Sequence, residues 1–418
     1  MNKKYVDHSW DFRKANTKTY TNCFHSYPAM MIPQVASRLL DLYGKKTKLL
    51  FDPYCGTGTS LVEANVRGIN AVGTDINPLA RLVARAKTTV ISLQVVDLYL
   101  KDFNDYLFKI KFAIPQNICL PVFQNIDFWF KKDTQEKLAI IKEYIEKIED
   151  ETVNIFFKAA FSETARRVSL TKNGEFKLVR IPKDKIDVFS PDVFGIMECK
   201  LSRNRTGLKE YMENKKGQAK SQIYDFNTVY GFPKNILAKN SVDLIATSPP
   251  YGDSRTTVAY GQFSRLSNQW LNIENANQID TLSMGGRKIK NKIRFDFKPL
   301  DEAIEKIMVQ DEKRAFDVIS FYADYQKSIE NITPSVKKQG LVAYVVGNRR
   351  VKDIELPTDE VTREFFTRNG LKHIKTIIRN IPNKRMPKKN SPTNEIGKKS
   401  TTMNREYIVI LKKVPYPN

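Results

Sequence analysis

The sequence predicts a doubly wound α/β fold with a mostly parallel sheet and a largely helical insertion. Three observations predict it. A strand, a glycine loop, a helix and a second strand follow one another over residues 48–75. A nearly continuous apolar stretch at 340–347 is typical of a sheet strand that is buried on both faces. Between these regions the alternation stops, and residues 132–148 and 153–167 show helical spacing.

The elements of the two α/β regions follow from apolar runs and from the residues that bound them. In the first region we expect a strand at 49–51, a helix at 60–67, a strand at 69–74 and a helix from Pro78. In the second we expect strands at 242–246, 340–347, 371–380 and 406–411, and helices at 316–332 and 357–369. The last two strands are joined by a long loop.

Composition limits the class of protein. The 418 residues include 69 Lys and Arg and 46 Asp and Glu, and the net charge of +23 favours a polyanionic partner over a merely solvated basic surface. A hydrophobic share of 41% excludes a mainly disordered chain. The start lacks a secretion signal, and no apolar run is long enough to cross a bilayer, so we expect a cytoplasmic protein without membrane contact. The four cysteines and three histidines are scattered, which disfavours a metal site or disulfides.

The first motif is the glycine loop. Gly56 and Gly58 follow a strand and precede a helix, so a ligand can approach the backbone closely. The third glycine of a dinucleotide fingerprint is replaced by Leu61, and no Gly-Lys-Ser/Thr follows, so neither NAD, FAD nor a P-loop is indicated. Asp75, at the end of the next strand, suits two ribose hydroxyls; its alternative role is to cap the turn at Asn77.

The second motif is the Ser-Pro-Pro-Tyr turn at 248–251. Two prolines make the turn rigid and leave mainly carbonyl acceptors. Ser248 adds a hydroxyl acceptor and Tyr251 an aromatic face, a combination that suits a flat ring with an exocyclic amino group. Hydrogen bonds that localise the amino lone pair would prepare it for attack. The alternative is an ordinary Pro-Pro turn with a buried tyrosine.

Together, Asp-Pro-Tyr-Cys-Gly-Thr-Gly-Thr at 52–59 and Ser-Pro-Pro-Tyr at 248–251 resemble the amino-directed, S-adenosylmethionine-dependent DNA methyltransferases. The similarity extends upstream to Phe-His-Ser-Tyr-Pro-Ala-Met-Met-Ile-Pro at 24–33, which resembles the segment that these enzymes fold over the methionine end of the cofactor, and downstream to 347–349 and 381–387. It implies a Rossmann-like class I methyltransferase sheet of seven strands that ends in an antiparallel hairpin. Residues 1–90 would form the cofactor-binding half, 91–220 a helical candidate target-recognition region, and 221–418 the catalytic half with a basic loop.

The resemblance also implies roles for individual residues. The catalytic set is Ser248, Pro249, Pro250 and Tyr251. The set that binds S-adenosylmethionine is Tyr27, Pro28, Asp52, Tyr54, Cys55, Gly56, Gly58, Thr59, Asp75, Ile76, Asn77 and, as the adenine contact, Asp225. The partner is double-stranded DNA, and charge selects as its contacts Arg255, Arg349, Arg350, Lys384, Arg385, Lys388 and Lys389.

In this family the Ser-Pro-Pro-Tyr variant is associated with N4 of cytosine, whereas the Asn and Asp variants are associated with N6 of adenine. Methylation at carbon 5 needs a cysteine nucleophile in a Pro-Cys dipeptide, and none of the four cysteines follows a proline. We therefore expect direct displacement on a flipped cytosine, without a metal, in a restriction-modification system with a separate endonuclease. The alternatives are an N6-adenine enzyme, a tRNA or rRNA guanine-N2 methyltransferase, and a non-catalytic nucleic-acid-binding protein.

Overall fold

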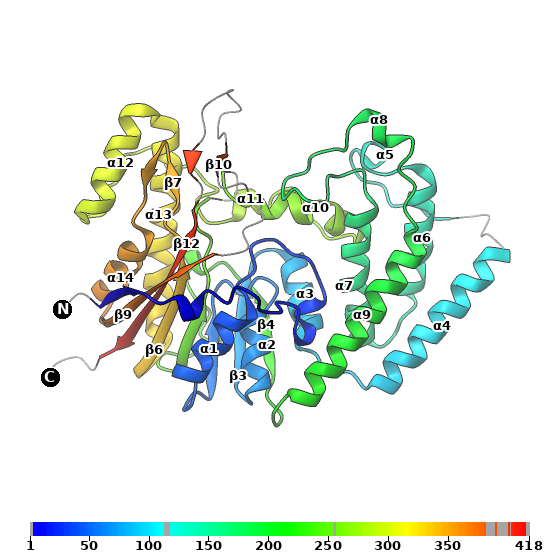
Figure 1. Ribbon diagram of the computed structural model, residues 1–418, viewed down its shortest axis with the longest axis horizontal. Helices are drawn as coiled ribbons and strands as arrows, with labels where there is room; N and C mark the ends of the chain where they lie inside the picture. The colour runs from blue at the N-terminus through cyan, green and yellow to red at the C-terminus, as the bar shows by residue number, and fades with distance from the viewer. Residues whose placement is uncertain are drawn as a thin grey trace.

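A computed structural model of the chain describes residues 3–112, 118–253, 256–381, 389–390, 400–401 and 403–414. Its centre is an eight-stranded sheet in the order β1-β9-β12-β6-β5-β2-β3-β4 (Figure 1). In chain order the strands are β1 Lys4–Val6, β2 Leu49–Asp52, β3 Asn70–Asp75, β4 Ser221–Asp225, β5 Val242–Thr247, β6 Val336–Val346, β9 Leu371–Asn380 and β12 Arg405–Lys413.

The strand pairing confirms the predicted fold class. All neighbouring strands pair in parallel except β12, which is antiparallel to both β6 and β9 and thus forms the expected hairpin. The sheet has one strand more than the seven expected, because Lys4–Val6 pairs in parallel with β9. This strand has three residues and an exposed surface, so it is too short to show a period of two in the sequence.

Helices cover both faces of the sheet, and β6 shows how the alternation of a strand divides the core. Val342 and Tyr344 point into one hydrophobic cluster, whereas Ala343 and Val345 point into another. The first cluster contains residues of α12 Lys298–Gln310, α13 Glu312–Ile332 and α14 Thr358–Arg368. The clusters on the opposite face contain residues of α1 Pro33–Tyr43, α2 Thr59–Val66 and α3 Pro78–Thr88.

A helical lobe separates β3 and α3 from β4 and lies beside that end of the sheet (Figure 1). It has its own core, in which Phe103, Leu138, Phe156 and Met197 are fully buried. The lobe is joined to the α/β part where α7 packs against α3 and α10. Its helices are α4 Leu93–Phe112, α5 Ile126–Trp129, α6 Lys132–Glu146, α7 Glu151–Val168, α8 Lys183–Ile186 and α9 Val193–Asn214.

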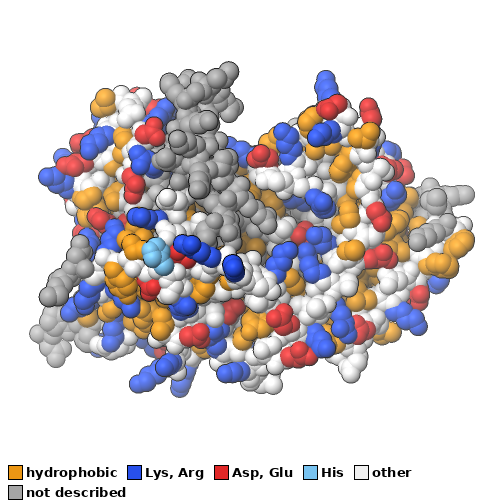
Figure 2. All heavy atoms as spheres, in the orientation of Figure 1, with side chains coloured by type: hydrophobic (Ala, Val, Ile, Leu, Met, Phe, Trp, Pro, Cys, Tyr) orange, Lys and Arg blue, Asp and Glu red, His pale blue; other side chains and the backbone are white. Residues whose placement is uncertain are grey.

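The remaining elements are short and lie mainly in the connections. They are η1 His8–Trp10, η2 Tyr20–Cys23, η3 Thr228–Tyr230, α10 Tyr260–Trp270, α11 Ile279–Leu282, η4 Thr333–Ser335, β7 Arg350–Val351, β8 Ile354–Glu355, β10 Lys389–Asn390 and β11 Ser400–Thr401. Within the described ranges, no helix combines the length and the apolar character that a membrane span needs. Figure 2 shows Lys and Arg side chains spread over both parts of the molecule.

The contact between α9 and η2 yields a test of how the lobe is attached. A Cβ on Gly207 would collide with Cys23 Sγ and lie 2.6 Å from the Tyr20 carbonyl oxygen. Gly207→Ala raises the helix propensity of α9, which stabilises the protein by about 1 kcal/mol. The added Cβ, however, meets the Tyr20 carbonyl oxygen, a backbone atom that cannot move aside easily, so we expect the steric clash to outweigh this gain. We expect the free energy of unfolding to fall by about 1–3 kcal/mol in urea titrations. Ser202→Ala, at an exposed position of the same helix, should leave it unchanged or slightly raised.

Candidate active site

The pairing of β2 with β5 brings the two sequence motifs together. The strands are parallel neighbours, with Leu50 opposite Leu244, so the loops that follow them leave the same edge of the sheet. A buried hydrogen bond joins their ends: the hydroxyl of Thr247 donates to Asp52 Oδ1 at 2.5 Å. The glycine loop and the Ser-Pro-Pro-Tyr turn therefore begin side by side.

Both motifs line one pocket, which encloses about 970 Å³ of empty space, the open solvent at its mouth included. Of the residues predicted from the sequence, the pocket is lined by Tyr27, Pro28, Asp52, Tyr54, Cys55, Gly56, Thr59, Asp75, Ile76, Asn77, Ser248 and Pro250.

The two loop glycines have different functions. Both adopt left-handed backbone conformations, with φ of 48° at Gly56 and 78° at Gly58. Gly56 lines the pocket, and a Cβ there would meet nothing within 4 Å, so the glycine leaves the backbone open to a ligand. Gly58 does not line the pocket. It caps α2, and its missing side chain lets α3 approach, since a Cβ would lie 3.1 Å from the Ala84 Cβ.

Asp75 shapes the loop as well as facing the pocket. Its two carboxylate oxygens accept the backbone N–H of Gly56 at 3.0 Å and of Asn77 at 2.7 Å. Burial raises the pKa of Asp75, an effect that these hydrogen bonds oppose. Asn77, not Asp75, caps α3 by accepting the N–H of Leu79. The carboxylate thus fixes the bend of the loop and offers its remaining lone pairs to the pocket.

Residues 27–31 of the N-terminal region also line the pocket. Tyr27 is buried, accepts a hydrogen bond from the side-chain amide of Asn77 at 2.8 Å, and stacks on Tyr260 with ring centroids 6.0 Å apart. Thr57 of the glycine loop donates to Met30 Sδ at 3.0 Å. The lobe holds the same segment, because Glu163 of α7 accepts the backbone N–H of Ser26 at 3.1 Å.

Asp52, at the floor of the pocket, is also buried. Burial raises the pKa of its carboxyl group to about 6, while the hydrogen bond from Thr247 acts in the opposite direction. The pocket therefore presents carboxylates toward a ligand in a largely apolar surrounding, where hydrogen bonds to them are strong.

The Ser-Pro-Pro-Tyr turn presents Ser248 and Pro250 to the pocket, whereas Pro249 and Tyr251 do not line it. Ser248 Oγ lies 3.1 Å from the Tyr251 hydroxyl, which donates in turn to Glu406 Oε1 at 3.1 Å. Burial raises the pKa of Tyr251 well above its usual value, so the phenol stays protonated. Tyr251 therefore contacts Ser248 from outside the pocket lining.

Several lining residues were not predicted from the sequence. Asp225 was the expected adenine contact, but the structure places it outside the pocket lining, where it pairs with Arg81 at 2.7 Å. Its neighbour Phe226 lines the pocket. The sequence does not reveal the register of β4, so it could not tell which of the two neighbouring residues lines the pocket. Tyr260 of α10 lies in a segment with no distinctive motif. The other unpredicted lining residues are Ala29, Met30, Met31, Pro53, Thr57, Ser60, Asn227, Thr228, Ile279, Ser283 and Met284.

The structure describes only part of the predicted DNA-contacting set. Arg349 is buried, with one guanidinium nitrogen 3.5 Å from Asp253, and burial lowers its pKa, so this side chain is not placed for phosphate contact. Arg350 is exposed and lies 3.8 Å from Glu355. Lys389 is in β10, and its side chain is not described. The others lie outside the described residues: Arg255, Lys384, Arg385 and Lys388.

The chemistry of the pocket matches neither a metal centre nor a covalent thiol site. Within the described part of the chain, no three His, Cys, Asp or Glu side chains come together as metal ligands. Cys55 lines the pocket, but burial raises its thiol pKa well above the usual value, which disfavours the reactive thiolate. What the pocket offers is backbone N–H groups, carboxylates, a serine hydroxyl and aromatic rings.

Comparison with known proteins shows which family the chain resembles. A DNA methylase family model, N6_N4_Mtase, matches residues 1–84. The Type II methyltransferase M.MvaI of Kocuria varians is 39% identical over 96% of this chain and 93% of its own length. A tRNA (guanine(10)-N2)-dimethyltransferase of Methanothermobacter thermautotrophicus is 42% identical over only 12% of the chain and 16% of its own.

Two solved structures with a distant resemblance to this one are a methyltransferase of rRNA and a putative DNA modification methylase. The rRNA methyltransferase aviRa of Streptomyces viridochromogenes covers 93% of the chain, and 88% of its own, at 10% identity and a TM-score of 0.34. The putative DNA modification methylase TTHA0409 of Thermus thermophilus covers 46%, and 53% of its own, at 14% identity and a TM-score of 0.21.

The full-length similarity to M.MvaI defines the class: the chain belongs to the amino-directed DNA methyltransferases. Its cofactor is S-adenosylmethionine, as in that family. The resemblance inferred from the two short motifs is thereby confirmed.

Gly347, at the end of β6, allows a direct test of the packing behind Ser248. A Cβ at this position would collide with Met403 Sδ and lie 2.8 Å from Tyr251 Cδ2. We expect Gly347→Ala to push the Tyr251 ring away and to lower the free energy of unfolding by about 1–3 kcal/mol in urea titrations. Gly174→Ala is the control, since a Cβ there meets nothing within 4 Å. Equal stabilities would show that Gly347 does not set the position of the ring.

Proposed function

We propose that this protein transfers the methyl group of S-adenosylmethionine to N4 of cytosine in duplex DNA, after the base has been turned out of the helix. We further propose that it acts in the cytoplasm, as the modification enzyme that accompanies a separate restriction endonuclease. The observation that carries the proposal is the shared pocket: Ser248 and Pro250 line the same space as Gly56 and Asp75.

The residues present suit the cofactor. The open backbone at Gly56 and the buried carboxylate of Asp75 fit a nucleoside whose ribose hydroxyls donate hydrogen bonds. Tyr27 and Met30 would cover its methionine end, and Phe226 is the candidate for contact with adenine. When bound, S-adenosylmethionine supplies an electrophilic methyl group. The chain's own residues have to hold an amine in line with that group and keep water out.

At the other end of the pocket, Ser248 and the carbonyl oxygens of the proline turn would accept the amino protons of the flipped base. An exocyclic amine is a poor nucleophile because its lone pair is delocalised into the ring. Hydrogen-bond acceptors that hold both amino protons can pull the amino group out of conjugation with the ring. The lone pair is then localised on nitrogen and ready for attack. No charged intermediate on the protein is required.

The choice of N4-cytosine depends on the Ser-Pro-Pro-Tyr motif. The choice of DNA is supported by the match to the DNA methylase family model and by the similarity to the Type II methyltransferase M.MvaI. The helical lobe, residues 91–220, is our candidate for target recognition. It flanks the pocket, since α7 contacts both α3 and α10, which contribute to or support the pocket walls. Arg350 and the basic segment around Lys384 remain candidates for phosphate contact.

The reaction is tested by nucleoside analysis. Duplex DNA incubated with the protein and S-adenosylmethionine should yield N4-methylcytosine after digestion and mass spectrometry. N6-methyladenine would instead establish the alternative amine. Methylation of guanine in transfer RNA, with DNA left unmodified, would contradict the proposal.

Asp75→Ala tests the cofactor site. The variant loses the ribose acceptor and the two hydrogen bonds that shape the loop, so we expect cofactor affinity, measured by calorimetry, to fall at least about tenfold. Asp225→Asn is the matched control, because its carboxyl group is largely exposed and outside the pocket lining. Its affinity should stay within about twofold of the wild type. If Asp225→Asn weakened cofactor binding and Asp75→Ala did not, Asp225 would be the nucleoside contact and Asp75 would not belong to the site.

A further inference from the structure

Behind Ser248 lies a chain of polar side chains that the sequence motifs do not reveal. Tyr251 donates its phenolic proton to Glu406 Oε1 of β12 at 3.1 Å. The second carboxylate oxygen of Glu406 pairs with the Arg379 guanidinium of β9. The Arg379 and Glu406 side chains are only 5% and 17% exposed, so the pair is largely removed from water. It forms across the antiparallel hairpin, where Glu406 and Arg379 are register partners.

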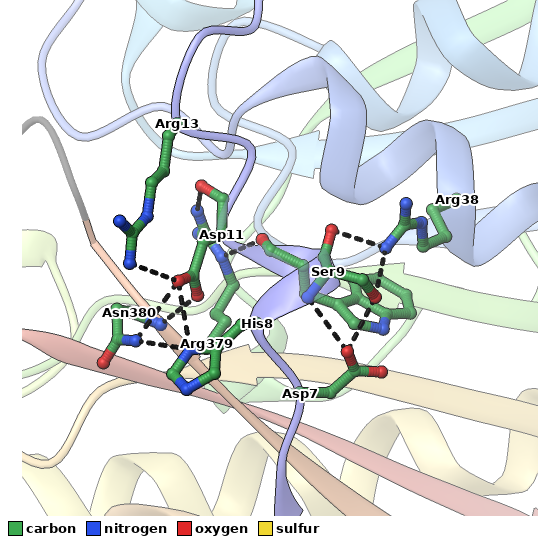
Figure 3. A network of polar contacts seen from close by, with 9 residues as sticks. Asp7, His8, Ser9, Asp11, Arg13, Arg38, Arg379 and Asn380 are labelled. Carbon is green, nitrogen blue, oxygen red and sulfur yellow. Dashed lines mark hydrogen bonds and ion pairs between the residues drawn. The ribbon is translucent and has the colours of Figure 1, made fainter.

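The N-terminal segment holds Arg379 in place (Figure 3). Arg379 Nε donates to the Trp10 carbonyl oxygen at 2.8 Å, and another guanidinium nitrogen donates to the Asp11 carbonyl oxygen at 3.3 Å. The Asp11 carboxylate accepts the backbone N–H of Asn380 at 2.7 Å. Arg38 of α1 fixes the same segment by donating to the Ser9 carbonyl oxygen at 2.7 Å. The guanidinium thus has partners on both sides and a defined orientation.

This arrangement fixes the direction of every hydrogen bond up to the pocket. The Glu406 carboxylate is ion-paired with Arg379, and an ionised carboxylate can only accept hydrogen bonds. The single hydroxyl proton of Tyr251 must then point at Glu406. The Tyr251 oxygen is left to accept, and the 3.1 Å contact with Ser248 becomes a hydrogen bond donated by the serine. The proton of Ser248 is therefore turned away from the pocket, and its lone pairs face the ligand.

We propose that Glu406, held by Arg379, is a positioning residue that makes Ser248 an obligatory acceptor for the amino group of the target base. This inference rests on the proposed function. Without Glu406, Tyr251 could donate to Ser248, and the serine proton would then point toward the amine and repel its N–H groups. The pair acts through Tyr251 and Ser248 and has no contact with the pocket itself.

A double-mutant cycle tests the inference with label transfer from S-adenosylmethionine to duplex DNA. We expect Glu406→Gln and Tyr251→Phe each to lower kcat about tenfold or more, with KM for DNA and cofactor affinity within about twofold of the wild type. The double variant should be no slower than Tyr251→Phe alone, because both changes break the same chain. Multiplicative losses would overturn the inference, and so would an unchanged kcat in Glu406→Gln.

Two further measurements separate this role from a structural one. Glu355→Gln removes an exposed carboxylate that also lies near an arginine, Arg350, and should leave kcat unchanged. If Glu406→Gln fails to fold because Arg379 loses its ion-pair partner, Tyr251→Phe decides alone, since it keeps the pair. Wild-type kcat in that variant would overturn the inference. Wild-type protein that transfers no label to DNA would instead overturn the proposed function, on which the inference depends.

Discussion

The parallel pairing of β2 with β5 is the constraint on which the rest of the site depends. It sets Asp52 and Thr247, the last residues of the two strands, within one hydrogen bond of each other at 2.5 Å. A slip of one residue would exchange the two faces of the strand and turn Asp52 away from Thr247. Because the core on both faces is apolar, that slip would also expose buried side chains, so hydrophobic packing enforces the register of the catalytic edge.

Four carboxylates with little exposure to water lie in and around the site. Asp52, Asp75, Glu163 and Glu406 are each largely removed from water, and each accepts hydrogen bonds from backbone N–H groups, hydroxyls or cations. Burying a charged carboxylate without partners is unfavourable, so hydrogen bonds and ion pairs are needed to keep such a group available as an acceptor. The partners come from segments far apart in the chain, so a carboxylate can be in place only when the tertiary structure is complete.

This long-range character explains what could be predicted from the sequence. The glycine loop and the Ser-Pro-Pro-Tyr turn are local patterns with steric causes, and residues of both line one pocket. Glu406 lies 155 residues from Tyr251, and no local pattern marks it. The role expected of Asp225 depended on a register that sequence cannot fix to one residue. Helix α9 lies in the region expected to be mostly helical, but its bounds were not predicted, because much of its surface is polar and its apolar face is defined only by the lobe it packs against.

The N-terminal segment shows the limit of such prediction most clearly. Its contacts with Arg379 are made by the carbonyl oxygens of Trp10 and Asp11, groups that every residue type carries. The side chains of the segment serve to anchor it, through Asp11 on Asn380 and Trp10 beneath Arg38. The contacts of this segment with Arg379 therefore depend on the path of its backbone and not on its residue types. Such a segment gives no motif, yet it supports the arginine on which the orientation of Ser248 depends.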